Sequence, residues 1–181
     1  PAPDEAAWHP IGAAVPGLAH ERFLITATGS TMRTLERDPE HCIGLVELDA
    51  AGEAYRIAWG FAHGGHPTSE LMPHLLAHAA REIATGGADR AIIHTHPTHL
   101  IALTYARDLD TPTLSRLLWE MHTECIVFFP TGLGFVPWAV PGSKELAEAT
   151  AKVLERRSIA LWAHHGVVAA GPDLDHVFGL I

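Results

Sequence analysis

The sequence has few cysteines, no long uninterrupted hydrophobic run and no visible signal peptide behind Pro1. Its 181 residues include two cysteines, Cys42 and Cys125, which form no Cys-x-x-Cys pair and cannot build a disulfide framework. We therefore expect a reducing, cytoplasmic compartment. No apolar stretch approaches the roughly 20 residues that span a membrane, so we expect no membrane partner.

Basic residues are also scarce. Twelve Lys and Arg stand against 21 Asp and Glu, for a net charge of −9. No Lys/Arg stripe is visible, which argues against nucleic acid as the main partner. A small anionic substrate is not excluded, because a few local donors or a metal ion can outweigh the net charge.

The composition, with 48% hydrophobic and 18% charged residues, is typical of a globular protein that buries one core. No internal repeat, linker or low-complexity tract appears, so we predict a single domain over residues 1–181. At the C-terminal end, a helix capped at Asp173 stops after roughly two turns on Phe178, Leu180 and Ile181. Such apolar residues need a packing partner, so we expect a fragment of a longer protein, truncated at both ends.

The spacing of apolar residues and turn signals predicts an α/β fold. Two hairpins are expected, and hairpins interleaved with helices favour a mostly antiparallel sheet covered by helices. The crossovers of a doubly wound parallel sheet are absent. Strands are expected at residues 23–28, 43–48, 54–59, 91–95, 125–129, 135–140, 159–163 and 167–169, and helices at 69–85, from 98, at 110–121, at 143–157 and from 173.

Three histidines follow the apolar run of the expected strand 91–95, within the stretch HTHPTH. Side chains two positions apart on a strand share a face, so His94 and His96 project together and could chelate one ion. His99 lies beyond Pro97 in a different local geometry. Taken alone, this pair is equally well explained as two polar residues at a strand end.

A catalytic zinc site needs a third protein ligand and an open position. The stretch LWAHHG, again at the end of an apolar strand, offers His164 or His165 as that ligand. A His-His-Gly turn on its own is more often structural. The two features together, each at the end of a regular element, favour a metal site.

Glu70 closes the stretch GHPTSE at the start of an expected helix, where the helix dipole favours a carboxylate. Ser or Thr followed by Glu is also ordinary helix-start chemistry. Beside a set of three histidines, however, such a glutamate is a candidate general base or transient ligand.

These motifs resemble the class II aldolase/adducin superfamily, most closely its L-rhamnulose-1-phosphate aldolases. The similarity covers most of the chain in the same order. The matching stretches are PTSEL (67–71), HTHPTHLIALTY (94–105), LWEMHTECIVFFP (118–130), WAVPG (138–142) and LWAHHGVVAAGPDLDHVFGLI (161–181).

The resemblance implies a central, mostly antiparallel sheet flanked by helices, a homotetramer, and one Zn²⁺ per subunit. It assigns the zinc ligands to His94, His96 and His165. It also assigns the catalytic carboxylates to Glu70 and to Glu124, which would reach the neighbouring subunit's active site. The implied substrate-binding and phosphate-binding residues are Thr28, Gly29, Thr68 and Ser69.

The implied reaction is the reversible cleavage of L-rhamnulose 1-phosphate to dihydroxyacetone phosphate and L-lactaldehyde, in rhamnose catabolism. Breaking a carbon–carbon bond beside a ketone leaves an enediolate, whose charge a divalent cation stabilises. Glu70 would move the proton on the dihydroxyacetone carbon, and Glu124 the proton on the aldehyde-side oxygen. The superfamily's N-terminal helix, Gly/Asn-rich loop and final helical segment have no match here.

Three alternatives remain at this point. A JAMM-type metalloprotease also combines a glutamate with HxHP, but its Ser and Asp positions hold Thr104 and Arg107 here. Sister enzymes acting on L-fuculose 1-phosphate or L-ribulose 5-phosphate, or a sugar-phosphate dehydratase, share the three-histidine zinc. An adducin-like, non-catalytic interaction module would keep the fold without the metal, although the complete set of histidines argues against it.

Overall fold

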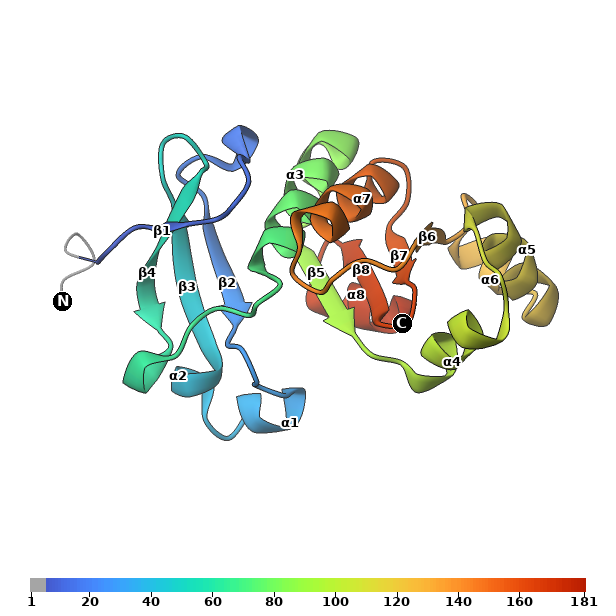
Figure 1. Ribbon diagram of the computed structural model, residues 1–181, viewed down its shortest axis with the longest axis horizontal. Coiled ribbons are helices and arrows are strands. Elements are labelled where there is room, and N and C mark those ends of the chain that lie inside the picture. Colours follow the sequence, from blue (N-terminus) through green and yellow to red (C-terminus); the bar gives the residue numbers. More distant parts are fainter. Residues whose placement is uncertain (1–5) are drawn as a thin grey trace. The chain divides into compact units, whose positions relative to one another are not determined.

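A computed structural model describes residues 6–181 (Figure 1). The chain divides between Leu75 and Leu76 into two compact units, each built around its own sheet. The boundary falls inside helix α3 (Leu71–Thr85). Among the residues that the structure describes, no helix is both long and apolar enough to cross a membrane. The single domain expected from the sequence stays a prediction.

The first unit contains an antiparallel sheet in the order β1-β4-β3-β2. Its β3–β4 hairpin is the one expected at residues 43–59, and the Asp49 carboxylate accepts the backbone N–H groups of Glu53 and Ala54 at 2.8 and 3.2 Å in the turn. Every second residue of β3 is buried, as a half-covered strand requires. The strands are β1 (His9–Pro10), β2 (Arg22–Thr26), β3 (Ile43–Leu48) and β4 (Ala54–Gly60), and the short helices are η2 (Pro16–Leu18), α1 (Met32–Leu35), α2 (Pro39–Cys42) and η3 (Ala62–Gly64).

The second unit contains a sheet in the order β5-β8-β7-β6, antiparallel except for the β6–β7 pair. The two central strands are buried at every position, because helices cover both faces (Figure 1). Trp162 and Val168 pack with α7 (Lys144–Leu154). Leu161 and Val167 pack on the opposite face with α5 (Thr111–Met121) and α8 (Leu174–Leu180). The strands are β5 (Ala91–Thr95), β6 (Gly134–Val136), β7 (Ile159–Trp162) and β8 (Gly166–Gly171).

Three helices of the second unit begin at the polar residues that the sequence indicated. The side chains of Asp110, Ser143 and Asp173 each accept a backbone N–H from the first turn of the helix that follows. These N-caps satisfy donors that would otherwise lack a partner inside the helix. The helices are α4 (Thr98–Ala106), α5 (Thr111–Met121), α6 (Cys125–Phe128), α7 (Lys144–Leu154) and α8 (Leu174–Leu180).

The second expected hairpin, over residues 125–129 and 135–140, is wrong. Cys125–Phe128 is the short helix α6, and β6 pairs in parallel with β7 instead. The apolar residues Ile126, Val127 and Phe128 are exposed, and β6 occupies the edge of the sheet beside β7. An apolar run without a strand to pair with has no reason to stay extended.

The fold class is confirmed: the chain is an α/β protein whose strand pairs are antiparallel apart from β6–β7. The sequence led us to expect one central sheet, whereas residues 6–181 form two four-stranded sheets. Side chains alternate between the two faces of the sheet along β5 and β8, so every second side chain points to the same face as Trp162. His94 is one of them, and it contacts Trp162 directly.

Candidate metal centre

His94 lies in strand β5 and His96 directly follows its last residue, and the two side chains share one face, as their spacing predicted. Their Nε2 atoms lie 2.9 Å apart. His94 Nδ1 lies 2.9 Å from the carbonyl oxygen of Val167 on the neighbouring strand, so this nitrogen carries the proton and donates it. The Nε2 lone pair of His94 is therefore directed toward His96, in the tautomer that a metal ligand needs.

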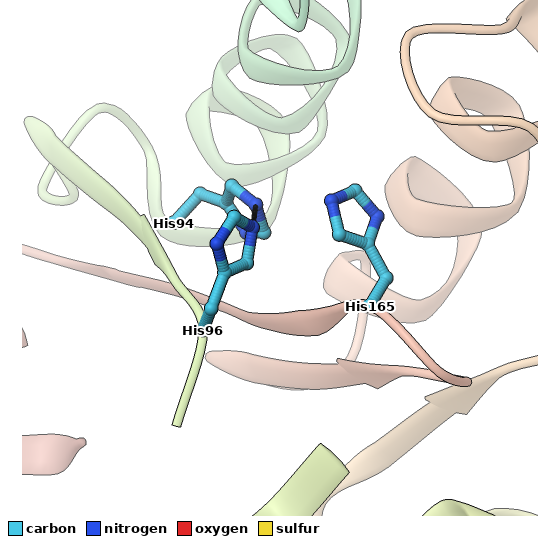
Figure 2. A group of neighbouring side chains, drawn as sticks. All are labelled: His94, His96 and His165. Atoms are coloured by element: carbon cyan, nitrogen blue, oxygen red, sulfur yellow. Dashed lines mark hydrogen bonds between the residues drawn. The ribbon is translucent and has the colours of Figure 1, made fainter. Parts of the chain in front are cut away.

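His165 reaches the same place from the turn between β7 and β8. Figure 2 shows the rings of His94 and His96 at the end of β5, with the ring of His165 facing them from that turn. One ligating nitrogen from each of the three residues lies within 4.8 Å of the others. The local sequence left the choice between His164 and His165 open, the family resemblance assigned His165, and it is His165 that joins the group.

Gly166 makes this approach possible. A Cβ atom added to Gly166 would collide with the carbonyl oxygen of Thr95, and would lie 2.8 Å from the ring of His96 and 3.0 Å from that of His94. The glycine of the His-His-Gly turn is thus required by the close contact between β8 and the histidine-bearing end of β5.

Trp162 supports two of the three rings from the sheet. It is 1% exposed, with its ring centroid 4.5 Å from that of His94 and 5.0 Å from that of His165. Burial, and then the nearby His96, lower the pKa of His165 below its ordinary value. Both effects favour the neutral imidazole, which is the form that binds a metal.

The three histidines fit a divalent transition metal. Tetrahedral zinc with bonds near 2.0–2.1 Å holds its nitrogen ligands roughly 3.3 Å apart. The 2.9 Å between the Nε2 atoms of His94 and His96, and the 4.8 Å within which all three ligating nitrogens lie, bracket that value. Imidazole nitrogens suit zinc and related ions, and three protein ligands leave a position open for substrate. The structure therefore contains a group able to hold such an ion, as the sequence predicted.

The predicted phosphate residues lie together in the first unit, where the end of β2 meets the segment before α3. The backbone N–H of Thr28 donates to His66 O at 3.0 Å, and that of Thr68 donates to Thr26 O at 2.9 Å. These bonds hold the Thr28-Gly29 turn beside the segment that carries Thr68 and Ser69. Their role in binding phosphate remains a prediction.

A cavity of about 370 Å³ opens on this turn. Thr28 and Gly29 line it, and so do Arg37 and His41. Sequence reasoning missed the last two residues: Arg37 lies in the turn between α1 and α2, and His41 lies in α2. Arg37 brings a positive charge to the cavity, and Asp38, which contacts His41 at 2.6 Å, brings a negative one.

Glu70 is buried, with 6% of its surface exposed, at the start of α3 in the first unit. Its backbone N–H donates to the Thr68 hydroxyl at 3.3 Å. Loss of hydration raises the pKa of its carboxyl from 4.5 to about 7. A carboxyl that titrates near neutral pH can both take up and release a proton, as a general base must.

Glu124 lies in the second unit as the residue before α6, and it is exposed. It does not belong to the group of three histidines. Its predicted action in a neighbouring subunit's active site stays a prediction, as does the placement of Glu70 with respect to the histidines.

Known proteins resemble the chain over nearly its whole length. It is 46% identical over 172 residues to the rhamnulose-1-phosphate aldolases of Escherichia fergusonii and Escherichia coli, covering 95% of this chain and 63% of each relative. The chain thus spans less than two thirds of the curated relatives it matches.

Solved structures agree with the sequence relatives. A sugar-phosphate aldolase from Thermotoga maritima matches 97% of this chain and 72% of its own, with a TM-score of 0.78 and 32% identity. An L-fuculose 1-phosphate aldolase matches 88% of this chain and 63% of its own, with a TM-score of 0.61 and 26% identity. The model of the class II aldolase and adducin N-terminal domain matches residues 5–181. With this match and the three convergent histidines, the chain belongs to the class II aldolase and adducin N-terminal domain family.

Proposed function

We propose that this chain forms the metal-binding part of a zinc-dependent aldolase that reversibly cleaves L-rhamnulose 1-phosphate to dihydroxyacetone phosphate and L-lactaldehyde. The observation that carries the proposal is the meeting of His94, His96 and His165 within 4.8 Å, from two segments far apart in the sequence. The 46% identity to rhamnulose-1-phosphate aldolases supports the choice of substrate.

His94, His96 and His165 would hold the zinc ion. When bound, zinc supplies Lewis-acid stabilisation of the negative charge that develops when the carbon–carbon bond beside the ketone breaks. The protein's own part is to keep the imidazoles correctly turned. The bond from His94 Nδ1 to Val167 O and the buried ring of Trp162 both serve that purpose.

Glu70 is the proposed base. Its carboxyl would take the proton from the hydroxyl-bearing carbon of dihydroxyacetone phosphate in the synthetic direction, and return it to that carbon in cleavage. The pKa of about 7 makes both the charged and the neutral forms available at neutral pH. A carboxylate with an ordinary pKa would be a weaker base for the same step.

The phosphate group of the substrate would be bound by Thr28, Gly29, Thr68 and Ser69. Hydroxyls and backbone N–H groups of this kind bind phosphate without needing a strongly basic protein. Arg37 lines the adjoining cavity and adds a positive charge there. The proposal therefore agrees with the acidic composition of the chain as a whole.

Glu124 is proposed to act in a neighbouring subunit of a homotetramer. Next to it along the chain lie exposed apolar side chains, namely Met121, Ile126, Val127 and Phe128, each more than half exposed. A cluster of this kind is typical of a protein–protein interface. Burying it against a second copy would bring Glu124 to the other subunit's site. A cytoplasmic location, which suits the free cysteines Cys42 and Cys125, completes the proposal.

A retro-aldol assay tests this function. The protein is incubated with L-rhamnulose 1-phosphate, and the release of dihydroxyacetone phosphate is followed before chelation, after chelation and after zinc is added back. L-Fuculose 1-phosphate serves as a parallel substrate, the epimerisation of L-ribulose 5-phosphate is followed in a separate assay, and His94→Ala serves as the metal-site control.

The expected result is cleavage of L-rhamnulose 1-phosphate that disappears with the chelator, returns with zinc and is absent in His94→Ala. Cleavage of L-fuculose 1-phosphate alone would keep the metal site and overturn the substrate. A folded, zinc-loaded protein that converts none of the three sugar phosphates would overturn the proposed reaction, and a folded protein that binds no zinc would favour an adducin-like module.

A further inference from the structure

The turn that carries His165 includes a residue in an unusual backbone conformation. His164 has a φ of +62°, in the left-handed region that favours glycine. A non-glycine residue stays in this region only where its surroundings hold it there. The direction of His165 follows from that conformation, because the two residues are adjacent in the Ala163–Gly166 turn.

Helix α4 holds His164 through three contacts. The backbone N–H of His164 donates to the hydroxyl of Thr104 at 2.9 Å. Its ring Nε2 lies 3.2 Å from the carbonyl oxygen of Thr104, to which it donates. Its ring also stacks on Tyr105, with centroids 4.0 Å apart and planes 12° apart. The ring of His164 is therefore turned toward α4.

The Thr104 hydroxyl is well placed for this task. It donates its own proton to the carbonyl oxygen of Ile101 at 2.7 Å, which leaves its lone pairs for the N–H of His164. Thr104 is buried, so water competes weakly for these bonds. Tyr105, by contrast, is 70% exposed, and its ring covers the outer side of His164.

Helix α4 also follows directly from the other two histidines. Only Pro97 separates His96 from the first residue of α4. The helix thus begins at the segment that carries His94 and His96, and near its other end it contacts the turn that carries His165. The short helix α4 therefore connects the segment that carries His94 and His96 with the turn that carries His165.

We propose that α4 is a clip that sets the position of His165 against His94 and His96, with Thr104, Tyr105 and His164 as positioning residues for the metal centre. This inference rests on the proposed metal site and adds to it. None of the three positioning residues needs to touch the ion or the substrate. Their effect is transmitted through the backbone of the turn.

The test compares paired variants of the complete protein. Thr104→Val removes the hydroxyl and Thr104→Ser keeps it. Tyr105→Ala removes the stacked ring and Tyr105→Phe keeps it. Two quantities are measured: the zinc Kd by competition with a chromophoric chelator, and the visible ligand-field spectrum of the cobalt(II)-loaded protein. Far-UV circular dichroism identifies the folded variants. If Thr104→Val does not fold, the comparison of Tyr105→Ala with Tyr105→Phe, at an exposed position, is sufficient to test the proposal.

We expect Thr104→Val and Tyr105→Ala to weaken zinc binding about tenfold or more and to alter the cobalt spectrum, whereas the two conservative variants stay within about threefold of the unsubstituted protein. In a His164→Gly background, Tyr105→Ala should have no further effect, because the ring it contacts is gone. Equal zinc affinities for Tyr105→Ala and Tyr105→Phe would overturn the inference. An unsubstituted protein that bound neither ion would overturn the metal centre itself.

Discussion

The ring centroids of Trp162 and His94 lie 4.5 Å apart, with an angle of 31° between the two ring planes. The indole of Trp162 is buried in the core of the second unit. The same indole lies 5.0 Å from His165. One core residue thus supports a histidine from each of the two segments that meet at the candidate metal centre. The orientation of the histidines depends on the packing of this core.

Trp162→Phe should therefore weaken zinc binding about tenfold, and should lower the free energy of unfolding by about 2 kcal/mol through the volume it removes. Trp138→Phe is the matched control, because Trp138 is 65% exposed. Zinc competition and urea unfolding measure the two effects. If both substitutions left zinc affinity unchanged, the support attributed to Trp162 would be absent.

Substituting a proposed metal ligand and substituting a proposed proton-transfer residue should have different effects on zinc content and turnover. His94→Ala removes one of three ligands, so the protein should lose stoichiometric zinc. Glu124→Ala should keep zinc yet cut turnover by a hundredfold or so, as removal of a proton-transfer group does. Metal analysis by atomic absorption and the retro-aldol assay provide the readouts. A His94→Ala protein that retained zinc and activity would contradict the ligand assignment.

Glu70 should make stability depend on pH in an unusual direction. Its carboxyl has a pKa of about 7 in the folded protein and an ordinary value of 4.5 when hydrated. Between pH 4.5 and 7 the Glu70 carboxyl is ionised in the unfolded chain but still protonated in the folded protein. The free energy of unfolding therefore falls as pH rises, by about 3 kcal/mol over the whole interval. Below pH 4.5 this contribution is fully retained.

Glu70→Gln isolates this effect, since glutamine stays neutral throughout. In chelator-treated protein, the unfolding free energy of the variant relative to the unsubstituted chain should grow between pH 4.5 and 7. Urea titrations at several pH values measure it, and the difference between the two proteins cancels the titration of the histidines. A difference that did not vary with pH would mean that the carboxyl is hydrated.

Gly166→Ala should disturb the metal centre, because the added Cβ meets the Thr95 carbonyl oxygen and the rings of His96 and His94. We expect a loss of about 2–3 kcal/mol in unfolding free energy and a marked loss of zinc affinity. Gly179→Ala is the control: it lies in α8 with no atom within 4 Å of the new Cβ, so stability should stay the same or rise by up to about 1 kcal/mol. Thermal unfolding with and without zinc distinguishes them, and equal responses would argue against a close approach at Gly166.

Arg81 anchors the C-terminal end of α7. It forms an ion pair with Asp89 at 2.7 Å and donates to the carbonyl oxygens of Leu154 and Arg157 at 2.8 and 3.0 Å. Arg81→Met leaves these partly buried groups without their partner, which should cost about 3 kcal/mol. Arg116→Met breaks an exposed pair with Glu120 and should cost under about 0.5 kcal/mol. Urea unfolding measures the free energy of unfolding of both variants, and similar decreases in the two would refute the anchoring role of Arg81.

Much of the second unit could be predicted from local sequence. An apolar strand followed by two histidines two positions apart fixes which face they share, and β5 has the expected bounds. Helix starts at Asp110, Ser143 and Asp173 were predictable because their capping side chains act within one turn.

The errors and omissions have a common physical cause. The run at 125–129 has the composition of a strand, but whether a strand forms depends on a partner that the local sequence does not reveal. The contacts of Thr104 and Tyr105 with His164 join residues about 60 positions apart, which no periodicity predicts. The burial that raises the pKa of Glu70 is likewise a property of the folded chain.

The separation of the ligands along the chain has a consequence for the lifetime of the protein. His94 and His165 lie about 70 residues apart, so an ion shared between them would be a reversible cross-link that closes a long loop. At a free zinc concentration a thousand times Kd, such an ion adds about 4 kcal/mol to stability. Scarce zinc would then expose the second unit to proteases, so that the cell would lose the protein itself along with its activity.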